Sequence, residues 1–330
     1  MFEFRGPAAG ASDGFLPVNC DPWRWLPGIS SGACLSAILI CACRPEQPGN
    51  DSEAPRADAT QALTVCENES FKIMAETQLV VPGPALDWLE LADSAFTALL
   101  GPPPSAQPQR IVLFSGTDFW PRSSCDHPYD RLVEHGAAAF FARTCGMVHV
   151  RQDVTTANPE DLRASLLHEA VHQRVMRQRF PALSGPGAWI SEGIGLYFEC
   201  LDEDGRVDLG RSERLSQARV LFQSGRFLPL SEFTALDAEG LDALAQERVL
   251  YPWHGRVQER RVSLHHVQAF AVMAFIHRRF RPELRGLLEV GLSSGLSPEV
   301  LERHLGLGLS EIARKYEDSY QGLSIAGVDY

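Results

Sequence analysis

The sequence predicts an α+β protein: a small mixed sheet with helices, then a helix that carries the motif HExxH, then a helical C-terminal part. Three observations lead to this fold class. Short strand-like segments alternate with one helical segment between residues 61 and 150, a capped helical pattern covers residues 159–179, and the pattern after residue 201 is helical. We therefore expect an N-terminal α/β part over residues 61–201 and a helical part over residues 202–330.

The first residues resemble a bacterial lipoprotein signal peptide, over residues 1–43. No charge occurs between Arg24 and Arg44, and an apolar run leads into Ile40-Cys41-Ala42-Cys43. In such signals an aliphatic and a small residue precede the cysteine that becomes lipidated, here Cys43. The apolar core, about ten residues long, is short for a membrane span. A plain signal peptide or an uncleaved anchor is the alternative.

Residues 44–60 are rich in Pro, Glu, Asp, Gly and Ser, which predicts a disordered tether. Together with the signal, this predicts an exported protein held at the cell envelope by a lipid anchor, with secretion as the alternative. The net charge of −12 argues against a nucleic-acid partner, because phosphates favour a basic face.

Export would allow disulfides among the four cysteines beyond the signal. We favour Cys125 with Cys145, which close a loop before the next strand, and Cys66 with Cys200 then follows by elimination. Buried free thiols are the alternative. Zinc binding by these cysteines is disfavoured because no CxxC pair exists.

The N-terminal part alternates strands with a helix. The predicted helix covers residues 85–100 and ends at Gly101 and three prolines. The predicted strands cover residues 63–65, 71–74, 110–114, 137–142 and 147–150.

The HExxH helix has clear start and stop signals. Asn158 can cap it, Pro159 suits its first position, and Phe180-Pro181 ends it after about Arg179. A turn at residues 184–187 leads to a second helical pattern at residues 189–199.

The helical part contains an apolar stripe in its longest segment that should face a core. Its predicted helices cover residues 212–223, 231–236, 263–279, 282–290, 298–305 and 310–320.

The motif itself predicts a zinc site. Positions i and i+4 share a helix face, so His168 and His172 can bind one ion while Glu169 reaches its bound water. Catalytic zinc usually has three protein ligands. Glu192 follows His172 by twenty positions, and a helix, a reversal and a second helix would return it to the pair. A surface helix with two ordinary histidines is the alternative.

On these residues the chain resembles the gluzincin metallopeptidases, whose signature is HExxH followed by a glutamate in a W-x-x-E-G helix, and nearest are exported bacterial peptidase-like proteins. The resemblance implies a zincin-like fold, zinc ligands at His168, His172 and Glu192, and a general base at Glu169. It also implies that the last strand before the helix is an exposed edge that pairs with an extended peptide. The candidate residues are Met147, Val148, His149 and Val150, for which an ordinary core or edge strand is the alternative.

Gluzincins add a Tyr or His donor for the oxyanion from the C-terminal part. The tyrosine of the related sequences is absent here, and His266 occupies its place, with His265, His254 and Tyr251 as competitors. A solvated histidine at a helix end is the alternative for His266.

The sequence therefore predicts a zinc-dependent peptidase of the cell envelope that hydrolyses peptide or protein substrates through a zinc-activated water. The alternative is an inactive zinc-binding or metal-free scaffold lipoprotein of the same fold. An intact Glu169 favours the enzyme, since folding needs no base, whereas the missing tyrosine favours the scaffold.

Overall fold

The computed structural model describes residues 63–76, 82–102, 107–114, 139–142, 145–151, 159–177 and 184–321. These residues all belong to one compact unit, Gly32–Tyr330, while a second unit, Met1–Ser31, falls outside the description. The α+β class is confirmed, and the boundary between residues 201 and 202 stays a prediction.

The predicted signal peptide, the lipidation site at Cys43 and the tether all lie outside the described residues. Within the described part of the chain, no helix has both the length and the apolar character that crossing a bilayer requires. Export and the lipid anchor stay predictions.

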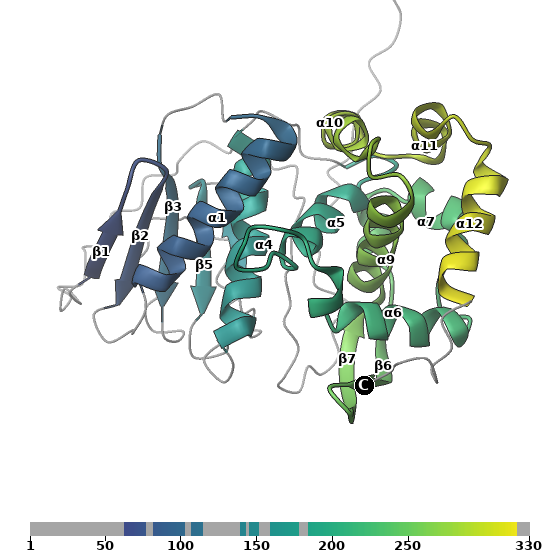
Figure 1. Ribbon diagram of the computed structural model, residues 1–330, viewed down its shortest axis with the longest axis horizontal. Coiled ribbons are helices and arrows are strands. Elements are labelled where there is room, and N and C mark those ends of the chain that lie inside the picture. Colours follow the sequence, from purple (N-terminus) through teal and green to yellow (C-terminus); the bar gives the residue numbers. More distant parts are fainter. Residues whose placement is uncertain are drawn as a thin grey trace, which may run out of the picture. The chain divides into compact units, whose positions relative to one another are not determined.

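The N-terminal part forms a five-stranded mixed sheet with the order β1-β2-β3-β5-β4. β2–β3 and β3–β5 are parallel pairs, whereas β1–β2 and β4–β5 are antiparallel. Helix α1 (Pro82–Leu100) connects the parallel strands β2 and β3 (Figure 1). The strands are β1 (Leu63–Glu67), β2 (Phe71–Glu76), β3 (Gln109–Phe114), β4 (Ala139–Ala142) and β5 (Met147–Arg151).

One face of this sheet is packed against α1 and the HExxH helix α4 (Pro159–Arg177). The strand register places Ile73, Ile111 and Val148 side by side across β2, β3 and β5. They share a buried cluster with Leu89 of α1 and Leu166 of α4. Burial of such aliphatic side chains contributes about 1.5–3 kcal/mol each, so α4 is held firmly on the sheet.

Helix α4 also faces a second, larger core. Leu167, Val171 and Val175 belong to a cluster that continues through α5 (Trp189–Phe198) and α9 (Leu264–Arg279). All residues from Leu264 to Ile276 are buried, so burial extends around α9 beyond the predicted apolar stripe. Helix α4 is therefore the element shared by both cores.

The helices of the C-terminal part were predicted, except for the two shortest, at Leu209–Arg211 and Ala238–Asp242. The remaining helices are η2 (Leu209–Arg211), α6 (Arg214–Gln223), α7 (Leu230–Ala235), α8 (Ala238–Asp242), α10 (Leu284–Ser294), α11 (Pro298–Leu305) and α12 (Leu309–Gln321).

A two-stranded hairpin, β6 (Gln246–Trp253) and β7 (Arg256–Ser263), interrupts the helices and was missed in the sequence. Its turn places both His254 and Gly255 at positive φ, as a type I′ hairpin turn requires, but histidine is an unusual residue there. Leu250 and Val257 are apolar but exposed, at 61% and 75%. The two strands therefore lack the clear alternation of apolar and polar residues by which a strand is recognised in a sequence.

The predicted disulfide between Cys66 and Cys200 is wrong, because both residues are free thiols. Cys66 lies on β1 at one edge of the sheet, whereas Cys200 is buried in the helical core, where its thiol donates to the carbonyl of Leu196. Burial raises the pKa of Cys200 to about 12. Cys125 lies outside the described residues, so its pairing with Cys145 stays a prediction.

Two tyrosines one turn apart on α12 offer a matched test of core packing. Both are buried, but Tyr320 donates its hydroxyl to the carbonyl of Ala271 at 2.8 Å, while the Tyr316 hydroxyl has no hydrogen-bond partner among the described residues. We predict that Tyr320→Phe lowers the free energy of unfolding by about 1 kcal/mol, and that Tyr316→Phe leaves it unchanged or raises it. Urea denaturation measures both, and an equal loss for the two variants would contradict the prediction.

Candidate metal centre

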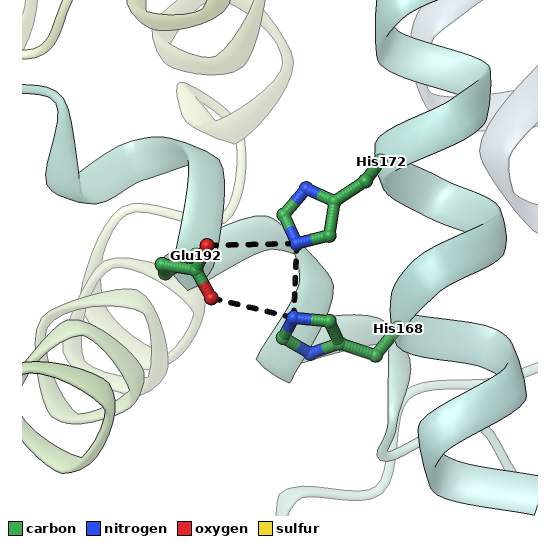
Figure 2. A group of neighbouring side chains, drawn as sticks. All are labelled: His168, His172 and Glu192. Carbon is green, nitrogen blue, oxygen red and sulfur yellow. Dashed lines mark hydrogen bonds and ion pairs between the residues drawn. The ribbon is translucent and has the colours of Figure 1, made fainter. Parts of the chain in front are cut away.

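Three predicted ligands converge on one point between α4 and α5. The Nε2 atoms of His168 and His172 lie 2.9 Å apart, and Glu192 places its two carboxylate oxygens 3.3 Å from the first and 3.7 Å from the second. Figure 2 shows the histidine pair on one helix, facing Glu192 on the other. The helix–turn–helix geometry expected from the sequence is thus present.

The turn before α5 determines where Glu192 lies. Gly187 has a φ of +81°, and a Cβ atom there would lie 2.2 Å from the backbone nitrogen of Leu296. Only glycine permits this close approach. The backbone groups of Gly187 bond to Leu236 and Leu296, and the indole of Trp189 donates to the Leu296 carbonyl. The start of α5 is thereby attached to the helical core.

The donor set fits a tetrahedral divalent ion. Zinc bound at about 2.0–2.1 Å places its ligand atoms about 3.3 Å apart, which is close to the three distances between His168, His172 and Glu192. All three side chains are buried, and among the described residues they are the one group of this kind. Two imidazole nitrogens and one carboxylate are ligand types that zinc accepts.

Glu169 lies beside this group and is fully buried. Neither of its carboxylate oxygens has a hydrogen-bond partner of normal geometry among the described residues, but the backbone of Phe141 on β4 lies near enough to favour the charged form. Burial raises the pKa of Glu169 to about 7, partly offset by His168. A carboxylate whose pKa is near neutrality can accept and release a proton.

A second carboxylate, which the sequence analysis missed, holds the other side of the His168 ring. Glu199, the residue that caps the end of α5, accepts from Nδ1 of His168 at 2.9 Å. It also binds Arg214, through Nε at 3.1 Å and Nη2 at 3.3 Å. Burial alone would raise the pKa of Glu199, but Arg214 and His168 hold it at about 2. Glu199 could have been recognised in the sequence from its seven-residue spacing from Glu192, because this spacing puts both glutamates on one face of the helix.

His266 is part of this neighbourhood. It lies in the first turn of α9, is buried, and places Nε2 3.4 Å from Glu192. It is therefore not a solvated histidine. Burial lowers the pKa of His266 to about 3, so its ring is neutral and retains one N–H to donate.

The three competitors for the donor role differ in their positions. His265 is buried next to His266, and its Nε2 has no hydrogen-bond partner among the described residues. His254 is exposed at the turn of the hairpin. Tyr251 is buried and donates its hydroxyl to Glu213 at 2.8 Å. Of the four, the structure places His266 in contact with a candidate ligand.

The prediction of a substrate-binding edge at Met147, Val148, His149 and Val150 is wrong. These residues form β5, which pairs with β3 on one side and β4 on the other, so its backbone groups are already used. All four are buried, and His149 stacks on Phe140 with ring centroids 5.0 Å apart. The edge strand next to the site is instead β4.

No family model and no curated protein matches this sequence. A functional assignment for the chain therefore depends on the geometry and chemistry of the buried centre.

Gly195 makes room for the His168 ring. A Cβ atom at this position would lie 2.8 to 3.0 Å from three ring atoms of His168. Alanine is a better helix former than glycine by up to about 1 kcal/mol. We nevertheless predict that Gly195→Ala lowers the free energy of unfolding by about 1–3 kcal/mol, because the ring must shift in a packed core.

Gly286 on α10 is the control, since a Cβ atom there meets no atom within 4 Å. We expect Gly286→Ala to raise the free energy of unfolding slightly. Thermal or urea unfolding compares the two variants, and equal stabilisation by both would contradict the close contact at His168.

Proposed function

We propose that the protein is a zinc-dependent peptidase of the gluzincin type with a zincin-like fold. The observation that carries this proposal is the convergence of His168, His172 and Glu192 on one buried point, with the Glu169 carboxylate beside it. A solvated helix with two ordinary histidines, the alternative reading of the motif, does not bury four such groups together.

The charges of the site support a divalent cation. Glu169, Glu192 and Glu199 are all largely buried, and among the ion pairs between described residues Arg214 is the permanent cation that contacts them. When the histidines are deprotonated, as metal binding requires, three carboxylates and one guanidinium leave up to two negative charges for a bound ion to compensate. Burying unpaired charge is costly, so a bound divalent ion would stabilise this arrangement.

The residues divide the chemistry of peptide hydrolysis between them. Zinc, when bound, would lower the pKa of a coordinated water and polarise a substrate carbonyl. Glu169 would accept the proton of the attacking water, because its carboxylate is buried beside His168 and Glu192 and its pKa is raised to about 7. His266 would donate its N–H to the oxygen on which negative charge develops.

The sheet supplies a place for an extended substrate. β4 pairs with β5 along one side and has no other strand partner among the described strands. Phe141 of β4 lies beside Glu169, so a peptide that added to this edge would pass the candidate base. We further propose that the substrates are peptides or proteins at the cell envelope, where a lipid anchor at Cys43 would hold the enzyme.

We predict that the purified protein binds about one zinc per chain and that His168→Ala abolishes this binding. The change removes one of the three candidate ligands, together with the ring that lies between Glu192 and Glu199. His304→Ala is the control, because His304 lies on α11 and belongs to no candidate metal group among the described residues. Atomic absorption after dialysis measures the metal, and circular dichroism checks that each variant is folded. Full zinc retention by His168→Ala would refute the site.

We further predict that Glu169→Gln lowers the rate of peptide hydrolysis by at least about 10²-fold with zinc content and fold unchanged, because glutamine keeps the size but cannot accept a proton. Glu160→Gln on the same helix is the control, since the Glu160 side chain is 60% exposed. Hydrolysis of a peptide library is the measurement.

Three outcomes separate the possibilities. Loss of activity only in Glu169→Gln supports the enzyme. Equal activity of wild type and Glu169→Gln means that the hydrolysis comes from a contaminant or another site. Zinc binding without hydrolysis of any peptide favours the scaffold alternative.

A further inference from the structure

We propose that Arg214 is a positioning residue that sets the metal affinity of the centre through Glu199. The proposal rests on the proposed zinc function and extends it to a residue that touches none of the three candidate ligands in the described contacts. It is drawn from the chain of contacts that runs from His168 through Glu199 to Arg214.

The first step is the orientation of His168. Glu199 accepts a hydrogen bond from Nδ1, so the proton of a neutral His168 ring lies on that nitrogen. Nε2 then presents its lone pair toward His172 and Glu192. A carboxylate behind a metal-binding histidine both fixes the ring and raises its basicity.

The second step is the orientation of Glu199. Its carboxylate could rotate, but Arg214 contacts both oxygens, Oε2 through Nε and Oε1 through Nη2. A guanidinium is planar, and this two-point contact determines the plane of the carboxylate. The contact therefore aims Oε1 at Nδ1 of His168. Since only 11% of the Glu199 side chain is exposed, water cannot replace Arg214 easily.

The place of Arg214 in the chain points to the same role. It is the first residue of α6, the end of a helix at which a cation is disfavoured. Its neighbour Glu213 precedes the helix and accepts a hydrogen bond from Tyr251 on β6, which fastens this end of α6 to the hairpin. The arginine thus gains nothing from the helix dipole, and its guanidinium is directed to Glu199.

A nearby ion pair of the same chemistry provides the control. Arg211 forms a two-point pair with Glu203, at 3.0 and 2.9 Å, but the Glu203 side chain is 79% exposed and neither residue contacts the centre. Arg211→Gln should therefore leave metal affinity unchanged.

The test is a zinc titration against a chromophoric chelator, with the apo form of the full chain. Glu199→Gln should weaken zinc binding about 10–100-fold, and Arg214→Gln should weaken it about tenfold. The double variant should bind no more weakly than Glu199→Gln alone, because Arg214 acts through Glu199. Arg214→Lys keeps the charge but loses the planar fork, so its affinity should fall between those of wild type and Arg214→Gln.

A second readout separates positioning from general destabilisation. The visible spectrum of the cobalt-loaded protein reports ligand geometry, so it should change in Glu199→Gln and Arg214→Gln and stay unchanged in Arg211→Gln. Should Arg214→Gln fail to fold, Arg214→Lys decides: weaker zinc binding supports the proposal, and wild-type affinity overturns it.

Two other results would also overturn the proposal. One is wild-type zinc affinity in Arg214→Gln, and the other is a loss of zinc affinity in the double variant equal to the sum of the two single losses. Either result would contradict the role of Arg214 without contradicting the zinc site. A wild-type protein that binds no zinc overturns both this inference and the proposed function.

Discussion

The structure depends on the contact between the His168 ring and one face of α5. Glu192, Gly195 and Glu199 follow one another along that face, at spacings of three and four residues. The two glutamates hold opposite nitrogens of the ring, and the glycine leaves the space that the ring occupies. One buried imidazole thus sets how closely the two helices approach, and the two glutamates set which way its Nε2, the candidate ligand atom, points.

The surrounding cores keep this contact rigid. Helix α4 is packed on the sheet through Leu166 and on the helical core through Val171, so it cannot rotate without disrupting one of them. The start of α5 is held through Gly187 and Trp189 by backbone groups near Leu296. A site built on elements that are packed on several sides is preorganised for a ligand that demands fixed geometry.

The three largely buried glutamates of the centre have different pKa values because each lies beside a different group. Three carboxylates are gathered where water has little access, and each is positioned against a different group: Glu192 against the histidines, Glu199 against Arg214, and Glu169 near the backbone of Phe141. The histidines hold the pKa of Glu192 well below its usual range and Arg214 lowers that of Glu199, whereas burial raises the pKa of Glu169 to about 7. Glutamate is therefore the residue type of a candidate ligand, of the partner of the His168 ring and of the candidate base.

The sequence by itself determined what depends on spacing within one or two helices: the α4 and α5 pair, the placement of His168, His172 and Glu192, and nearly all of the long helices. Tertiary structure decided the partners that come from distant segments, such as the Arg214–Glu199 contact and the burial of His266. It also decided that β4, and not β5, forms the sheet edge, and that Cys66 and Cys200 stay apart. The reason is physical: periodicity specifies which side chains share a face, but strand order and long-range pairing depend on packing between elements that no local pattern records.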